Sequence, residues 1–194
     1  MNEQLPMFDR AMNMWKEIDF LVQDEEVTDL SAYLNCLRDI YGNGTVLHKT
    51  FSVPEHPDFM DFVSRGALHS AYFFERFWRA RSISSALPFE LRELNFYSTD
   101  LFRWIHAVEL PGSLASTLVR GGAYGQGVPP ARKAMELATA AAEAMLGGDF
   151  ENTQVFIAHE AWSSFFCDVA WDYTCLVVQP DRRRIEVILA TDTD

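Results

Sequence analysis

The fold is decided by the stretch WDYTCLVVQPDRRRIEVILAT, residues 171–191. Its two halves alternate in character at every second residue, which is the period of a β-strand. The Pro and Asp of the segment between them, QPDRR at 179–183, favour a turn. We therefore predict an antiparallel hairpin in which Ile185, Val187 and Leu189 share the face that packs on the core.

A short apolar run over Val155–Ala158 precedes the hairpin and predicts a third strand, so that the C-terminal part forms an antiparallel meander. A hairpin alone is marginally stable in water. We therefore expect helices from the rest of the chain to cover one face of this sheet.

Helical patterns dominate the chain before the meander. Apolar residues recur at helical spacing over residues 1–22, 28–41, 58–62, 67–80 and 129–146. Shorter helices are predicted from Ser98 to about Val108 and over Ser113–Val119, and residues 46–53 also fit a strand. The fold class is therefore α+β, with a helical N-terminal two-thirds packed on a small C-terminal antiparallel sheet.

The length of 194 residues favours a single domain over residues 1–194. Within it we expect a mainly helical part over 1–147 and a mainly β part over 150–194. A chain of this size buries roughly 70% of its unfolded surface, so it needs neither a metal nor a disulfide to fold.

The formal net charge is −12 and the isoelectric point is near 4.8. Such a charge repels phosphates, so it disfavours nucleic acid and anionic membranes as partners and favours a basic protein. No apolar run is long enough for a membrane span, and no signal peptide is visible at the N-terminus. Three widely spaced cysteines predict no disulfide framework and fit a cytoplasmic protein with reduced, dispensable thiols.

The charge is unevenly spread along the chain. Residues 134–181 carry eight acids and no lysine or arginine, whereas residues 63–133 carry nine bases and five acids. One interpretation is that the basic middle pairs internally with its acidic flanks. The other is that the acids form an exposed face that docks a basic partner, where charge mainly sets the association rate and specificity.

The richest set of reactive side-chain types lies between His159 and Tyr173. A hydrolase- or nuclease-like enzyme could use His159 with Asp168 and Asp172, and Cys167 could serve as a nucleophile. The segment has three acids and no lysine or arginine, which opposes a thiolate, and no metal-ligand spacing is present. We therefore predict no catalytic site, metal or cofactor, and we interpret the glycine-rich segment RGGAYGQGVPP, residues 120–130, as a loop between helices.

A non-enzymatic role is favoured by this absence of motifs. The hypothesis is a small acidic protein that binds and neutralises or regulates a basic partner, by analogy with bacterial toxin-neutralising immunity proteins, which are often compact, acidic and poor in motifs. The alternatives are the enzyme above and an oligomeric scaffold or subunit. The residues predicted to bind the partner are Asp149, Glu151, Glu160, Trp162, Asp168, Trp171, Asp172 and Tyr173.

Overall fold

A computed structural model describes residues 7–23, 28–87, 89–91 and 101–193. Within these residues six strands form one antiparallel sheet with the order β1-β2-β6-β5-β4-β3. The strands are β1 (Leu21–Gln23), β2 (Thr45–Ser52), β3 (Arg103–Ile105), β4 (Gln154–Ala158), β5 (Tyr173–Gln179) and β6 (Arg184–Thr191).

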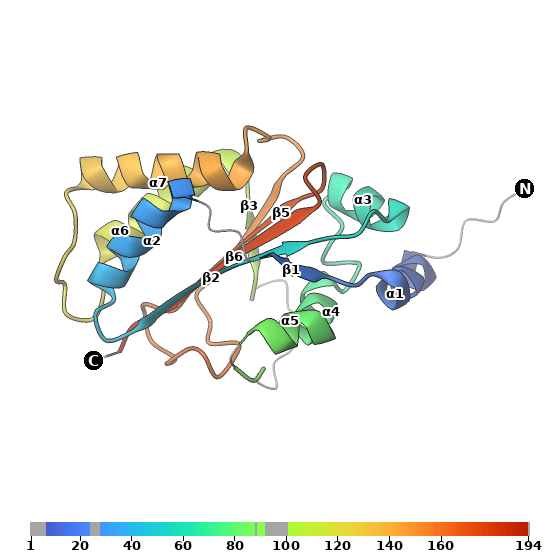
Figure 1. The fold of residues 1–194 in the computed structure, drawn as a ribbon, viewed down its shortest axis with the longest axis horizontal. Coiled ribbons are helices and arrows are strands. Elements are labelled where there is room, and N and C mark those ends of the chain that lie inside the picture. The colour runs from blue at the N-terminus through green and yellow to red at the C-terminus, as the bar shows by residue number, and fades with distance from the viewer. Residues whose placement is uncertain (1–6, 24–27, 88, 92–100, 194) are drawn as a thin grey trace, which may run out of the picture.

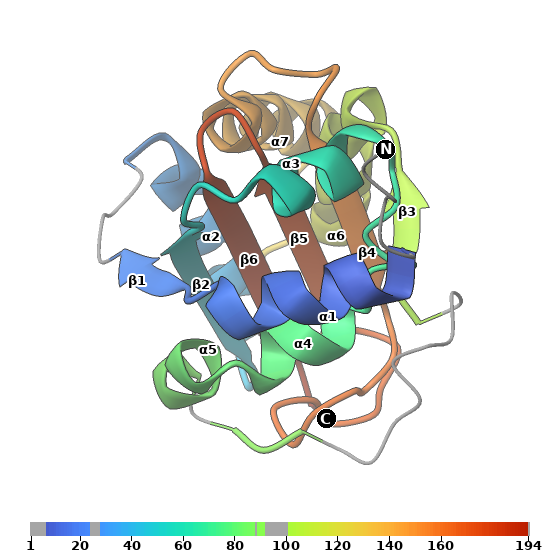
Figure 2. The ribbon, with the colours of Figure 1, turned by 90° about the vertical axis from the view of Figure 1, so that its right-hand side faces the viewer.

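Helices cover both faces of the sheet, which gives three layers (Figure 1). One face carries α2 (Thr28–Ile40), α6 (Leu110–Arg120) and α7 (Ala131–Leu146), with the 3-10 turn η1 (Ala107–Glu109) leading into α6. Figure 2 shows the opposite face, where α1 (Met7–Glu17), α3 (Pro57–Ser64), α4 (Phe73–Arg79) and α5 (Arg81–Ala86) lie.

The α+β class and the C-terminal hairpin are confirmed. Strands β5 and β6 pair antiparallel, with Val178 opposite Ile185, and Val187 and Leu189 are fully buried. Both faces of the hairpin are covered, rather than one, because a second helical layer packs on the other side. The central strands therefore read as nearly continuous apolar runs.

Three predicted helices were wrong in part, and one of them, expected over residues 67–80, begins only at Phe73, after Tyr72 in the left-handed conformation. The first helix ends at Glu17, and Leu21 and Val22 of the helix expected over residues 1–22 instead belong to the edge strand β1. Arg103–Ile105 form the opposite edge strand, β3, where we expected a helix; the N-terminal end of that predicted helix lies outside the described residues. A helical apolar spacing over so few residues is also met by a short strand, and pairing with β4 decides between them.

Other helix ends follow the sequence signals. Helix α3 begins after His56, whose Nδ1 accepts a hydrogen bond from the backbone N–H of Asp58. Helix α7 ends at Gly147, which adopts the left-handed conformation and donates its N–H to the carbonyl of Glu143 at 2.8 Å.

The face under α1, α3 and α4 is rich in aromatic side chains. Trp78 and Trp162 stack with their ring centroids 4.3 Å apart, and Phe74 stacks on Phe102 at the same distance. The indole N–H of Trp162 donates to Thr174 Oγ1 at 2.8 Å. Trp162 is therefore a core residue, with no surface exposed for a partner.

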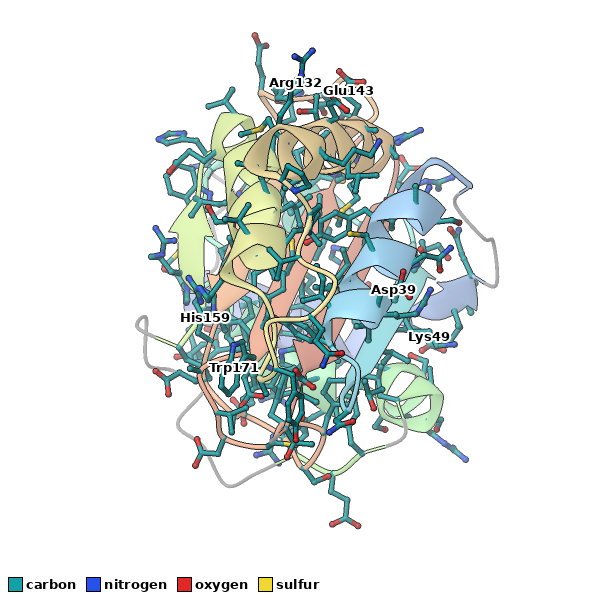
Figure 3. The ribbon with its side chains drawn as sticks, turned by 90° about the vertical axis from the view of Figure 1, so that its left-hand side faces the viewer. Asp39, Lys49, Arg132, Glu143, His159 and Trp171 are labelled. Carbon is teal, nitrogen blue, oxygen red and sulfur yellow. The ribbon has the colours of Figure 1, made fainter. Side chains whose placement is uncertain are left out.

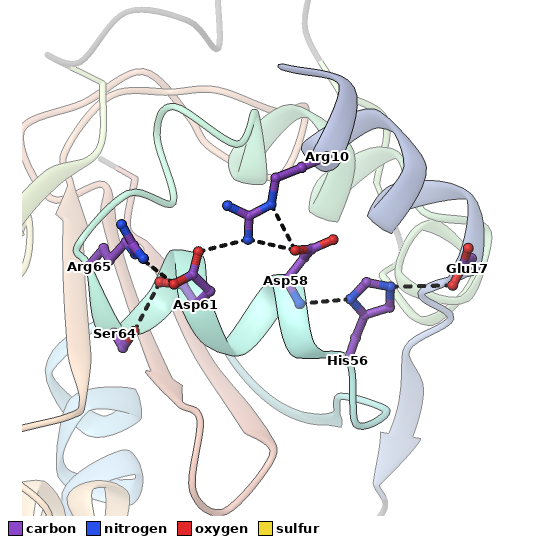
Figure 4. A network of polar contacts seen from close by, with 7 residues as sticks. All are labelled: Arg10, Glu17, His56, Asp58, Asp61, Ser64 and Arg65. Carbon is purple, nitrogen blue, oxygen red and sulfur yellow. Dashed lines mark hydrogen bonds and ion pairs between the residues drawn. The ribbon is translucent and has the colours of Figure 1, made fainter. Parts of the chain in front are cut away.

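A polar network ties α1 to α3 at the rim of this face (Figure 4). Arg10 donates to Asp58 and Asp61, and Arg65 donates to the other oxygen of Asp61. The hydrogen bonds from Arg10 and Arg65 lower the pKa of Asp61. This network uses two arginines and two aspartates from the N-terminal half, so it fixes the helices without involving residues 134–181.

Candidate functional site

A polar cleft of about 520 Å³ opens between α6 and the edge strand β3. It exists because α6 presents small side chains to the sheet along one face, at positions three and four residues apart. The bulky apolar residues of α6 lie on a different face of the helix, in the core. The described residues that line the cleft are Arg103, Ile105, Glu109, Gly112, Ser113, Ser116, Thr117, Arg120 and His159.

Antiparallel pairing places Arg103 and His159 on the same side of the sheet. Arg103 lies opposite Ile157 in the register, and Ile157 packs in the core under α6. Residues opposite each other share a face, as do residues two apart along a strand, so His159 also points toward α6. Diagonal positions of this kind lie roughly 7–8 Å apart, which brings both side chains within reach of one small molecule.

The hydrogen bonding of His159 fixes its tautomer. Nδ1 lies 3.2 Å from the carbonyl oxygen of Asp172, which can only accept, so Nδ1 carries the proton. Desolvation of the ring lowers the pKa of His159, and the nearby Arg120 and Arg103 charges lower it further, although the Asp172 carbonyl and Glu160 act in the opposite direction. The imidazole is therefore neutral near pH 7, and Nε2 carries a lone pair.

Arg103 and Arg120 supply the positive charge of the cleft. Both side chains are exposed, and neither forms an ion pair with any described residue. Glu109 is the only carboxylate among the described lining residues, and its Oε1 accepts the backbone N–H of His106 at 2.9 Å. The net charge of the lining is positive in a chain whose total charge is −12.

Tyr173 lies below the cleft on β5. Its ring centroid is 5.6 Å from that of His159, and its hydroxyl is buried without a well-formed hydrogen bond to a described residue. Burial raises the pKa of Tyr173 well above its usual value, and the Ser113 hydroxyl partly offsets this. The Tyr173 hydroxyl is therefore a polar group beneath the floor of the cleft, next to Ser113.

A buried carboxylate holds the loop that carries His159. Asp172 is fully buried; its Oδ1 accepts from Thr191 Oγ1 at 2.6 Å and its Oδ2 accepts from the N–H of Val169 at 3.0 Å. Thr191 Oγ1 in turn accepts from the N–H of Cys167 at 3.2 Å. These bonds tie the loop over 159–172 to the end of β6 and position the Asp172 carbonyl for His159.

The carboxylates of the predicted enzyme site do not converge on His159. Asp172 offers the imidazole its backbone carbonyl, while its carboxylate is occupied by Thr191 and Val169. Asp168 is exposed but does not line the cleft. Within the described residues there is also no group of three or more His, Cys, Asp or Glu side chains that could hold a metal ion.

The predicted partner-binding residues do not form one face. Trp162, Asp172 and Tyr173 are at most 1% exposed, because they belong to the core and to the hydrogen-bonded loop, so their prediction as surface contacts is corrected. Asp149 and Glu151 precede β4, whereas Glu160, Asp168 and Trp171 follow it. At roughly 3.3 Å per residue, this five-residue strand keeps the two groups about 15 Å apart.

Internal pairing with the basic middle, residues 63–133, occurs at Glu136. Glu136 pairs with Arg132 and Lys133 one turn away on α7. Glu143 and Glu151 are exposed and form no ion pair in the part of the chain that the structure describes. In Figure 3, Glu143 lies on α7 at the top of this face, whereas His159 and Trp171 lie toward its lower edge.

Two other hollows are smaller than the cleft between α6 and β3 and are weaker candidates for a binding site. One of about 280 Å³ is lined by three arginines together with Trp15, Phe20 and Asp19, but its Arg79 pairs with Glu75. Another of about 400 Å³ lies where Tyr124 of the glycine-rich loop meets the end of α2. The loop itself is held by Asp192, whose Oδ2 accepts the N–H of Ala123 at 2.7 Å.

The fold and the cleft define a class: a three-layer α+β protein with a cationic, hydroxyl-lined cleft at one edge of its sheet. Residues 99–194 match the model of a family of unknown function (DUF6183), and this stretch, slightly less than half of the chain, contains every described residue that lines the cleft. No curated protein and no solved structure matches the chain. Among the described residues, no helix combines the length and the apolar character that crossing a membrane requires.

Proposed function

We propose that this protein binds a small organic anion in the cleft between α6 and β3. The observation that carries the proposal is the pair Arg103 and Arg120, two exposed arginines that line one cleft and have no ion pair among the described residues. In a chain with net charge −12, cations beside a cavity are expected to be neutralised by the surplus of acids unless a ligand supplies the charge. Guanidinium groups bind carboxylate and phosphate in a bidentate manner.

The size and lining of the cleft support a ligand larger than a simple ion. A volume of about 520 Å³ falls within the range of roughly 300–1,000 Å³ that small-molecule sites occupy. Ser113 and Ser116 add hydroxyl groups that can donate to the ligand or accept from it. Ile105 is the one large apolar side chain among the described lining residues, so the ligand is expected to be polar.

Thermal unfolding with a panel of small carboxylates and phosphates tests this proposal. A ligand at about 100 times its Kd stabilises the folded state by about 2.7 kcal/mol, which raises the melting temperature measurably. We expect Arg103→Gln and Arg120→Gln to lose this shift. Arg38→Gln is the matched control, because Arg38 is exposed on α2, donates to Asn35, and is not among the described residues that line the cleft. Equal shifts in all three variants would refute the proposal.

We also propose, as a second function, that the protein acts in the cytosol as an immunity-like binder of a basic protein partner. The observation that favours it is the loop between α7 and β4, where exposed Phe150 lies between Asp149 and Glu151. Asp149 Oδ1 accepts the N–H of Glu151 and of Asn152, and Asn152 donates to Asp181, so the loop is ordered by its own acids. An aromatic anchor with a carboxylate rim suits a cationic protein surface.

The test of the second function uses the basic partner protein. This partner is first captured from an extract of the source cells on immobilised wild-type protein and then purified. Its association rate should fall between 0.01 and 0.15 M salt as the Debye length shrinks from about 30 to about 8 Å. Glu151→Lys should slow association, and Phe150→Ala should speed dissociation, without lowering the melting temperature. Glu160→Lys, beyond the other end of β4, is the matched control. A salt-independent rate, or an equal effect of Glu160→Lys, would contradict this site.

A further inference from the structure

We infer that the anion taken by the α6–β3 cleft is the phosphate group of a small hydroxylated phosphate monoester, bound with one proton shared between the phosphate and His159. This inference rests on the proposed anion-binding function and names its ligand class. It follows from the directions of the donors, their charge and the free nitrogen of His159.

The donors reach the cleft from three separate segments of the chain. Arg103 comes from β3, Arg120 from the last turn of α6, and His159 from the segment after β4, while Ser113 and Ser116 line the α6 wall. A carboxylate has two oxygens in one plane and accepts mainly from within that plane. A phosphate monoester presents three terminal oxygens arranged tetrahedrally, so donors from the sheet and from α6 can reach different oxygens of the same group.

Each of the two guanidinium groups of the cleft can meet one charge of a dianion, and Glu109, the one carboxylate among the described lining residues, brings the net charge of the lining to +1. Arg103 and Arg120 contribute two positive charges, and both are free of described ion pairs. A phosphate monoester carries about −1.5 to −2 at pH 7, because its second pKa is about 6. A monocarboxylate would neutralise only one of the two guanidinium groups.

His159 adds a contact that a phosphate monoester, whose second pKa is about 6, can use whether or not its oxygen carries a proton. Its Nδ1–H is committed to the Asp172 carbonyl, so Nε2 is the atom left to interact with a ligand. Neutral Nε2 accepts a hydrogen bond from a protonated phosphate oxygen, and protonated Nε2 donates to a deprotonated one. Either way the complex holds one proton at this contact, and binding above pH 7 therefore draws a proton from solvent.

Every element around His159 contributes groups that bear on this proton. Arg120 on α6 and Arg103 on β3 oppose a charged imidazole in the free protein. The Asp172 carbonyl and Glu160, next in the chain, favour it, and Glu109 at the end of η1 adds a negative charge to the cleft lining. A bound dianion would cancel the two arginine charges, and this makes protonation of His159 easier in the complex than in the free protein.

The rest of the cleft suits a hydroxylated body. Glu109 keeps one oxygen free of its bond to His106, and this oxygen can accept from a ligand hydroxyl. The buried Tyr173 hydroxyl lacks a well-formed partner next to Ser113, so a ligand oxygen that engages Ser113 would complete a chain of hydrogen bonds. Unmet buried hydroxyls of this kind are costly, and they select ligands that satisfy them.

Isothermal titration calorimetry with matched probes tests the inference. Glycerol 3-phosphate and glycerate share a hydroxylated three-carbon body and differ in phosphate against carboxylate. We expect glycerol 3-phosphate to bind at least tenfold more tightly than glycerate and to take up protons at pH 8, measured from the dependence of the heat on buffer ionisation. Inorganic phosphate, which lacks the body, should bind more weakly than glycerol 3-phosphate.

The variants separate this inference from the proposed function. His159→Asn keeps a donor to the Asp172 carbonyl but removes Nε2, so proton uptake should vanish and affinity should fall about tenfold. His106→Asn is the control, because asparagine also caps η1. Glycerate binding as tightly as glycerol 3-phosphate, or unchanged proton uptake in His159→Asn, would overturn the phosphate class while leaving anion binding intact. Failure of all three probes to bind wild type would overturn both.

Discussion

Replacing Asp172 by alanine removes the acceptor that holds the loop in front of β5. The carboxylate is fully buried and accepts from Thr191 Oγ1 at 2.6 Å and from the N–H of Val169 at 3.0 Å. A buried hydrogen bond to a charged group contributes about 1.5–3 kcal/mol, and a partly exposed one contributes about 1 kcal/mol. We therefore expect Asp172→Ala to lower the free energy of unfolding by about 3 kcal/mol, a large fraction of the roughly 5–15 kcal/mol typical of a domain.

Urea unfolding followed by far-UV circular dichroism measures this loss. Asp181→Ala is the matched control, because Asp181 is exposed and only accepts from Asn152, so its effect should stay within about 0.5 kcal/mol. A double-mutant cycle with Thr191→Val should give a coupling energy of about 1–2 kcal/mol between the two side chains. Additive single effects, or a loss below about 1 kcal/mol for Asp172→Ala, would refute the assignment of Asp172 to this network.

Three further predictions follow from packing and titration. Gly122→Ala should destabilise the fold by about 1–3 kcal/mol in urea unfolding, because its methyl group would lie 2.6 Å from a carbonyl of α2; wild-type stability would contradict this contact. Desolvation lowers the pKa of His69 and His159, so the unfolded chain binds protons more readily than the folded one, and the free energy of unfolding should fall from pH 7 to pH 5. A variant with asparagine at both positions should lose less stability over this range. An equal loss would argue against a contribution from these histidines. Burial raises the pKa of the Cys175 thiol to about 12, so iodoacetamide at pH 8 should modify exposed Cys167 and spare Cys175 until the chain unfolds. Mass spectrometry of the labelled protein measures this. Modification of Cys175 in the folded protein would contradict its burial.

Most of the fold could be predicted from local sequence patterns. The alternation over residues 171–191 predicted β5, the turn and β6 because strand pairing here agrees with the period of two in the sequence. The helix over 129–146 and its end at Gly147 were predicted for the same reason, since the signals lie within a few residues of each other. The edge strands β1 and β3 were missed because each has three residues, too few for a period, and only pairing with a distant neighbour defines them.

The candidate site could not be read from the sequence in the same way. His159 was singled out, but its predicted carboxylate partners were wrong, because the sequence does not show that Asp172 turns its side chain to Thr191 and its carbonyl to the imidazole. Ser113, Ser116, Thr117 and Arg120 do form a polar stripe at helical spacing, and this was an available signal. The stripe lines a cleft only because the strand β3 lies opposite it, and residues 103–105 were expected to be helical.

The partner-binding prediction failed at the aromatic residues for a related reason. Trp162 and Tyr173 lie in an acidic stretch, which suggested a surface, yet each side chain packs into the core on an opposite face of the sheet. Composition along the chain reports the average environment of a segment. Burial is set residue by residue by the alternation of the strands and by the helices that cover them.

The most direct test of the anion-binding cleft is NMR of the arginine side chains during titration with glycerol 3-phosphate. We expect saturable shifts in the Nε–Hε resonances of Arg103 and Arg120, with a common Kd, while those of Arg76, Arg79 and Arg81 in the smaller hollow stay unchanged. Shifts confined to the second set, or weak shifts spread over all arginines without saturation, would contradict the claim that the α6–β3 cleft is the binding site.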